Sequence, residues 1–291
     1  MTKKPKVILG VGVLLSVSLF VVDGMAVPGE KVLVSNVISS HVAVQGHYLI
    51  WSEYSDTPIR KIPKYGKDGG TISTLAHAIG AAMNLVIYDG YIFWIDRRGS
   101  GQPSDLRILN KTSLDGTTTA ALAKGYQYIG GGREYADIAI YEDSVYWVTG
   151  GYGVFSINKV PINGGESTTL VSRSKPITSL AQDGSSLYWV EWADDGYDKG
   201  AIMKMSLEGG PPSILYSNQN ILVWDVMAVS GDEIVFRASD SVQGHWGLMK
   251  VSATGGDPTF LAILTDQPNE PTNVPSRIII NGSNVYWADS H

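Results

Sequence analysis

The feature that most constrains the fold is a pattern that this chain repeats from end to end. Its clearest copy spans Pro176–Tyr216 and holds four short apolar runs, at Ile177–Ala181, Ser186–Glu191, Ala201–Ser206 and Ser213–Tyr216. Turn-forming residues separate the first run from the second and the third from the fourth. The copy therefore predicts a four-stranded antiparallel meander, which can bury its faces only against further copies.

The second predicted strand of each copy carries an aromatic anchor, usually a Tyr-Trp pair, just after a polar turn. The anchors are Trp51, Trp94, Trp147, Trp189, Phe236 and Trp287. The third predicted strand starts at or near a lysine and ends at a glycine turn. Five such segments follow the pattern: Lys61–Gly70, Lys111–Gly116, Lys159–Gly165, Lys204–Gly210 and Lys250–Gly256. The runs are short and β-branched rather than helical in period, so the chain is predicted to be an all-β, six-bladed propeller of four-stranded antiparallel blades.

The sequence predicts six second strands but only five third strands, and this difference affects how the ring of blades can close. Gly29–Ser35 looks like Gly165–Ser172, a predicted fourth strand, so the chain starts with the last strand of a blade. It ends with the first two strands of a blade, Arg277–Ile280 and Asn284–Asp289. Joining those ends would remove exposed sheet edges. We expect an incomplete closing blade, or a chain that is a truncated version of a longer one.

The first 26 residues differ from the rest in composition. Three lysines precede the apolar run Val7–Val22, and small residues precede a candidate cleavage point after Ala26. This order predicts a secretory signal over 1–26, followed by a single propeller domain over 27–291 that is secreted or periplasmic. A retained membrane anchor is the alternative, but the run falls short of a span of about 20 residues, so no stable membrane insertion is expected.

Charge and cysteine content exclude several classes of function. The formal net charge is −6 and the basic residues are scattered, so no nucleic-acid partner is expected. The chain has no cysteine, which excludes disulfides, thiol catalysis and cysteine-bound zinc.

The Tyr-Trp pairs, the Asp-Gly turns and the Lys-x-x-x-x-Gly-Gly segments resemble two families of six-bladed propellers over residues 29–289. These are the low-density-lipoprotein-receptor YWTD class and its bacterial relatives of the TolB-like group. The chain departs from the receptor pattern, because the Thr after Trp is absent from every copy. The acid two places after Trp is present as Glu53, Asp96, Glu191 and Asp289. The resemblance implies that these acids tie neighbouring blades together, with a metal-binding ring as the alternative. It does not specify function, because this fold hosts receptors, lyases, lactonases and assembly factors.

Strand order predicts which face of the propeller varies. Turns between the first and second strands, and between the third and fourth, are short and uniform, whereas the second-to-third loops and the blade crossovers are long and irregular. Function concentrates in such loops, so we expect ligand binding on the irregular face. Its candidate binding residues are Arg97, Arg98, Tyr128, Arg133, Tyr152, Trp192, Tyr197, Trp224, His245 and Trp246. Capping of the core is an equal alternative for Trp224 and Trp246.

These residues predict a non-catalytic propeller that binds a protein, peptide or carbohydrate partner. The alternative is a metal-dependent enzyme of the lyase or lactonase type. Two groups of residues could support an enzyme. The first is an acidic turn at Asp194, Asp195 and Asp198, which offers oxygen ligands for calcium. The second is His77 with His245 and nearby acids, which could serve as a general base and its partner. The acidic turn is only a fragment of a calcium loop, and the histidines follow no catalytic spacing. No metal, cofactor or catalytic residue is therefore assigned.

Overall fold

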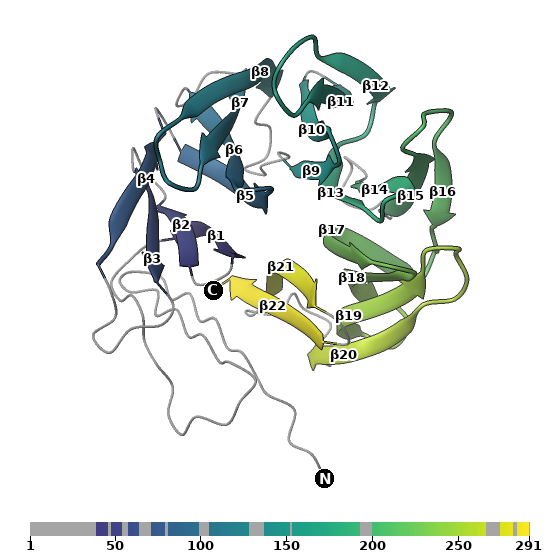
Figure 1. The fold of residues 1–291 in the computed structure, drawn as a ribbon. Helices are drawn as coiled ribbons and strands as arrows, with labels where there is room; N and C mark the ends of the chain where they lie inside the picture. The colour runs from purple at the N-terminus through teal and green to yellow at the C-terminus, as the bar shows by residue number, and fades with distance from the viewer. Residues whose placement is uncertain are drawn as a thin grey trace.

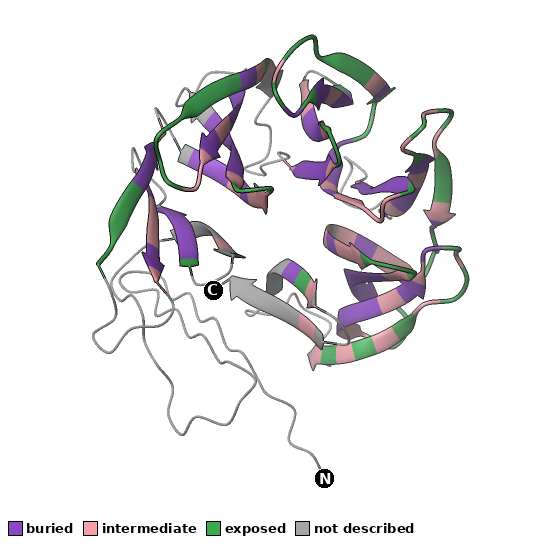
Figure 2. Ribbon diagram, in the orientation of Figure 1, coloured by how far each residue is buried: buried purple, intermediate pink, exposed green. Residues whose placement is uncertain are grey.

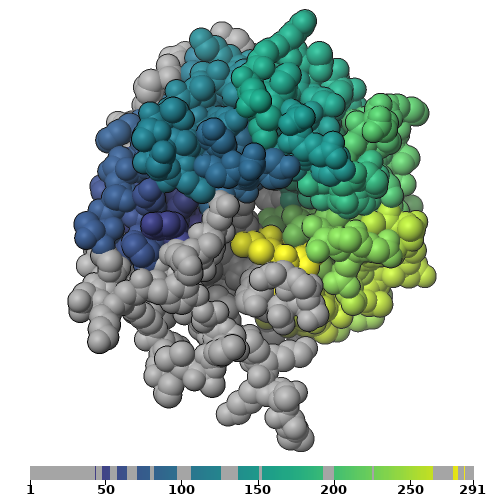
Figure 3. Space-filling view, in the orientation of Figure 1, coloured from purple at the N-terminus to yellow at the C-terminus, as the bar shows by residue number. Residues whose placement is uncertain are grey.

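The computed structural model describes residues 39–45, 48–53, 58–63, 71–78, 81–98, 105–127, 137–151, 153–192, 200–265, 274–281 and 284–290. These residues form antiparallel sheets arranged as sectors of a disc, in chain order around a central axis (Figure 1). The space-filling view shows the same circular progression from purple to yellow (Figure 3). Within the described residues, no helix is long and apolar enough to cross a membrane. Residues 1–26, the predicted signal, lie outside the described part of the chain.

Three sheets of four strands make up the first half of the disc. Blade 1 comprises β1 (Ser39–Gln45), β2 (Tyr48–Glu53), β3 (Pro58–Pro63) and β4 (Ser73–His77). Blade 2 comprises β5 (Ala81–Tyr88), β6 (Tyr91–Arg98), β7 (Asp105–Ser113) and β8 (Thr119–Gln127). Blade 3 comprises β9 (Ile138–Tyr141), β10 (Ser144–Gly151), β11 (Val154–Pro161) and β12 (Thr168–Arg173). A single parallel bridge between β8 and β10 joins blades 2 and 3 into one larger sheet.

The second half of the disc contains two more blades and a two-stranded sheet. Blade 4 comprises β13 (Ile177–Gln182), β14 (Ser186–Glu191), β15 (Ala201–Ser206) and β16 (Ser213–Tyr216). Blade 5 comprises β17 (Ile221–Ser230), β18 (Glu233–Asp240), β19 (His245–Ser252) and β20 (Thr259–Thr265). The closing sheet comprises β21 (Val274–Asn281) and β22 (Asn284–Ser290). The predicted all-β propeller of four-stranded antiparallel blades is confirmed, and the closing sheet has two described strands, as expected for an incomplete blade.

The sequence repeat corresponds to a pairing between the second and third strands that recurs in each blade. In each of the five blades, the lysine of the third strand lies opposite the residue just before the aromatic anchor: Lys61 opposite Ile50, Lys111 opposite Phe93, Lys159 opposite Tyr146, Lys204 opposite Tyr188 and Lys250 opposite Val235. The third strands were predicted to begin near these lysines, and for β7, β11 and β19 that is wrong. All three begin at least five residues before the lysine, because the backbone stays paired as far as the end of the second strand.

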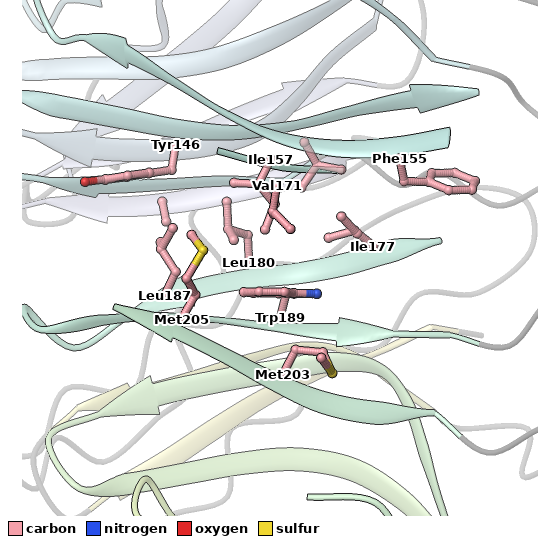
Figure 4. Close-up of a cluster of buried hydrophobic side chains, with 12 residues drawn as sticks. Tyr146, Phe155, Ile157, Val171, Ile177, Leu180, Leu187, Trp189, Met203 and Met205 are labelled. Carbon is pink, nitrogen blue, oxygen red and sulfur yellow. The ribbon is translucent and has the colours of Figure 1, made fainter. Parts of the chain in front are cut away.

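The core lies between blades rather than within them, as the repeat requires. Trp51, Trp94, Trp147 and Trp189 are each at most 2% exposed, so these four anchors are packing residues, as expected. Figure 4 shows Trp189 and Leu187 of blade 4 facing Ile157 of blade 3. The outer strands β4, β8, β12, β16 and β20 carry most of the exposed surface (Figure 2).

Candidate functional site

The predicted binding residues fall into three groups. Tyr128, Arg133, Tyr152 and Tyr197 lie outside the described residues. Arg97 and Arg98 end β6, where only the backbone is described. The side chains of Trp192, Trp224, His245 and Trp246 are described, and all four are partly buried. Trp224, His245 and Trp246 were expected in loops and instead lie on strands β17 and β19. Their strands are longer than the apolar pattern predicted.

Three of these side chains form a cluster. The ring centroids of Trp224 and Trp246 lie 4.9 Å apart with a tilt of 33°, and those of Trp192 and Trp224 lie 6.0 Å apart with a tilt of 42°. Trp192 follows the end of the second strand of blade 4, whereas Trp224 and Trp246 lie near the starts of the first and third strands of blade 5. These strand ends share the face of the irregular loops, which we call the loop face. We call the three residues the tryptophan cluster.

Strand register explains how blade 5 orients the cluster. Trp246 lies opposite Ser239, and Leu248 lies opposite Arg237, so these four side chains share one face of the blade. Leu248 packs against Ile278 of β21, which means that this face looks toward the closing sheet. On this face of blade 5 the apolar side chain of Leu248 is buried. Trp246 lies nearer the loop face and is only partly buried. The cluster is therefore an extension of the core that reaches the surface.

Two polar contacts fix the central ring of the cluster. The indole Nε1 of Trp224 donates a 3.2 Å hydrogen bond to Oγ of Ser239. The guanidinium carbon of Arg237, a residue only 7% exposed, lies 5.3 Å from the centroid of the Trp224 ring. A cation over an indole face is attracted by the ring quadrupole, most strongly where water is excluded. One face of Trp224 therefore already has a cationic partner, and its orientation is set before any ligand arrives.

A close backbone approach brings blade 4 beside the cluster. A Cβ atom added to Gly200 would lie 2.3 Å from the carbonyl oxygen of Val223, the residue before Trp224. Only glycine permits the start of β15 to lie this near β17. Gly200 therefore helps to place Trp192 of blade 4 within reach of Trp224 of blade 5.

The histidine pair considered from the sequence does not form one site. His77 ends β4 of blade 1, and His245 starts β19 of blade 5, where its ring meets the edge of Phe260 at 5.9 Å. Figure 1 places β4 and β19 on opposite sides of the disc. Among the residues that the structure describes, no group of three or more His, Asp or Glu side chains is arranged to hold a metal ion. The acidic turn at Asp194, Asp195 and Asp198 lies outside that part of the chain.

The acid two places after the anchor ties blades together at Glu191. Its carboxylate is 6% exposed and accepts hydrogen bonds from Nε and Nη2 of Arg173, at 2.5 Å and 3.1 Å. Arg173 ends β12, so the pair joins blade 3 to blade 4. The hydrogen bonds that Arg173 donates to Glu191 raise the pKa of Arg173, although burial opposes this. In blade 1, Ser52, which stands where the receptor pattern has Thr, donates a 2.9 Å hydrogen bond to the carbonyl oxygen of Ala82 in blade 2.

The opposite face, which carries the short turns, is built for stability. Asp183 accepts hydrogen bonds from the backbone N–H groups of Ser185 and Ser186, both at 2.8 Å, and from the hydroxyl of Tyr188 at 2.6 Å. Burial alone would raise the pKa of Asp183, but the hydrogen bonds from Tyr188 and the serines outweigh it and lower that pKa. Burial and the bond to Asp183 both raise the pKa of Tyr188. These groups organise a turn rather than a site.

Comparison with known proteins identifies the fold and not the activity. No protein-family model and no curated protein matches the chain. Among solved structures, a prolyl endopeptidase is similar with a TM-score of 0.57 and 10% identity, over 85% of this chain and 39% of that one. Oligogalacturonate lyase in complex with manganese gives a TM-score of 0.54 and 10% identity, over 81% and 65%. A quinonprotein alcohol dehydrogenase-like protein from Bacteroides thetaiotaomicron gives 0.52 and 13%, over 82% and 60%.

These similarities agree with the propeller fold that the repeat predicted. The chain spans less than two thirds of each of the three matched chains, and at such low identity their activities do not transfer. The choice between binding and catalysis therefore depends on the residues of this chain.

Proposed function

We propose that this chain is a secreted or periplasmic, non-catalytic propeller that binds a protein, peptide or carbohydrate partner on its loop face. The observation that supports this proposal most strongly is the tryptophan cluster. Three partly buried indole rings from two blades meet at one place on the face where the irregular loops emerge. Tryptophan is enriched at the centres of binding sites, because it offers a large apolar area with few rotatable bonds.

The proposed site is rigid, which lowers the cost of binding. The ring of Trp224 is held by Ser239 and Arg237, and its strand is paired with β18 on both sides of the irregular stretch in which Trp224 lies. A ligand that packs on such rings does not have to order them first, so less of the interaction energy is lost as side-chain entropy. The variable loops around the cluster would then supply specificity.

The export part of the proposal has its own support and its own test. The basic start, the apolar run and the small residues before Ala26 are the support. Amino-terminal sequencing of the exported chain is expected to begin at Val27. Recovery of an intact first residue in the cytoplasmic fraction would contradict export.

Binding can be tested without knowing the partner. The full chain is probed against a glycan array and a library of random peptides, in parallel with Trp224→Ala and with Tyr48→Ala. Tyr48 is a suitable control, because it is 45% exposed and starts β2 on the face of the short turns. The proposal predicts binders that Trp224→Ala loses and Tyr48→Ala keeps. Turnover of a recovered ligand, or binding that needs a chelatable metal, would instead support the enzyme alternative.

A further inference from the structure

A second concave feature of the loop face lies at the boundary between blades 3 and 4. It is a pocket of about 260 Å³ lined by Arg173 and Lys175 from blade 3 and its crossover, and by Glu191, Met203 and Ile214 from blade 4. Its volume is just below the range typical of drug-sized ligands, so it fits a small molecule or a single terminal group. The tryptophan cluster lies at the other side of blade 4, so the two features are separate.

The Arg173–Glu191 pair preorganises one wall of the pocket. Glu191 engages Nε and Nη2 of the guanidinium, which leaves the Nη1 edge of Arg173 as hydrogen-bond donors. Because the carboxylate is almost fully buried, it holds the guanidinium in one orientation. Arg173 itself is 35% exposed, so a ligand can reach its remaining donors. A fixed planar fork of this kind suits a carboxylate.

The charge and polarity of the lining restrict the ligand further. Arg173 and Lys175 both line the pocket, together with the carboxylate of Glu191. The lining therefore offers two cationic groups to an anionic ligand. Met203 and Ile214 form an apolar side, and Ile214 is 64% exposed. A ligand that satisfies both sides carries an anionic group and an apolar flank.

We propose that this pocket binds a small organic carboxylate with an apolar flank, with its carboxylate on Arg173 and Lys175 and its flank on Met203 and Ile214. An acidic sugar and an N-acylated amino acid share this chemistry. The pocket does not include any residue of the tryptophan cluster. The proposal of carboxylate binding can therefore be tested separately from the binding function proposed above.

The test measures binding of two carboxylates and their neutral counterparts by calorimetry and ligand-observed NMR. Glucuronate is paired with glucose, and N-acetylalanine with N-acetylalaninamide. At least one carboxylate is expected to bind, with its neutral counterpart weaker by about tenfold or more, because a neutral group makes weaker hydrogen bonds to the guanidinium of Arg173 than a carboxylate does. The carboxylate that binds more tightly shows whether the pocket prefers an acidic sugar or an N-acylated amino acid. Equal binding of acid and neutral forms, or no binding of either acid, would overturn the proposal.

Variants of the full chain locate the site. Lys175→Gln keeps the Arg173–Glu191 pair and should weaken binding several-fold, with a reduced dependence on salt. The double variant Arg173→Gln/Glu191→Gln removes both charges of the pair together, and it should abolish binding while a thermal melt confirms folding. Lys124→Gln, which changes an exposed lysine of β8, should bind as wild type does. An equal loss in Lys124→Gln would show non-specific attraction and contradict the site.

Discussion

The ammonium of Lys204 in blade 4 donates a 2.9 Å hydrogen bond to the carbonyl oxygen of Ala253 in blade 5. The same relation recurs elsewhere in the ring: Lys61 reaches the carbonyl oxygen of Leu114 at 2.6 Å, and Lys111 reaches that of Ile162 at 3.2 Å. Each acceptor is the first residue after the third strand of the next blade. Each lysine also lies over a tyrosine of its own blade. The recurring lysine is therefore a clamp between neighbouring blades.

Removing one clamp should destabilise the fold without changing its shape. Lys204→Met keeps the length of the side chain but leaves the carbonyl of the buried Ala253 without its donor. We expect the free energy of unfolding to fall by about 1 to 3 kcal/mol. Urea titration followed by circular dichroism measures this, with the exposed Lys124→Met as a control expected to stay within about 0.5 kcal/mol. Equal effects of the two variants would refute a clamp.

Breaking the pair between blades 3 and 4 should cost more than replacing it. Arg173→Met strands the buried carboxylate of Glu191, and we expect a loss of about 2 kcal/mol or more in unfolding free energy. Arg173→Met/Glu191→Leu removes the stranded charge and should recover most of that loss. Chemical denaturation of both variants gives the comparison. If the double variant is as unstable as the single one, the cost lies in lost packing and not in the unpaired charge.

The turn at Asp183 predicts a dependence of stability on pH. A pKa lowered by folding means that the carboxylate stabilises the protein above its unfolded pKa of about 4. This contribution is lost as the pH falls through the folded pKa. Asp183→Asn should therefore be less stable than wild type by about 1 kcal/mol at pH 7, and the difference should narrow below pH 4. Unfolding curves at several pH values test this, and a gap that does not vary with pH would contradict it.

The close approach at Gly200 predicts a link between blade spacing and the tryptophan cluster. In Gly200→Ala the new methyl group would meet the carbonyl oxygen of Val223, which is backbone and cannot rotate away. We expect a loss of about 1 to 3 kcal/mol in unfolding free energy. The separation of Trp192 from Trp224 should also change, which tryptophan fluorescence at neutral pH would register. A variant with wild-type stability and spectrum would show that β15 and β17 are not held at this distance.

The fold could be predicted from the sequence because its signals are local and repeated. In the copy at Pro176–Tyr216, the expected strands and the observed ones β13 to β16 agree to within one residue. The aromatic anchors could also be recognised from the sequence, because they recur at the same place in each copy. The lysine pattern was visible too, but its role was not, because the acceptor carbonyl lies about 50 residues away on another blade and carries no side-chain signature.

The candidate site was only partly predictable, for a related reason. Trp192, Trp224 and Trp246 stood out as aromatic residues in the segments predicted to be irregular loops. Arg237 and Ser239 did not, because they occupy ordinary positions within β18 and matter only through their contacts with Trp224 of the neighbouring strand β17. Arg173 was missed as well, since its partner belongs to the next blade. Contacts between blades depend on how neighbouring blades pack around the axis, which no single repeat encodes.

The central claim is that the loop face binds through the tryptophan cluster. The most direct measurement is the dissociation constant of a ligand recovered from the glycan or peptide library, for wild type, Trp224→Ala, Trp246→Ala and the control Tyr48→Ala. We predict that each cluster variant weakens binding by about tenfold or more, as truncation of a central aromatic residue does. Tyr48→Ala should stay within about twofold of wild type. Unchanged affinity in both cluster variants, or an equal loss in Tyr48→Ala, would contradict the account.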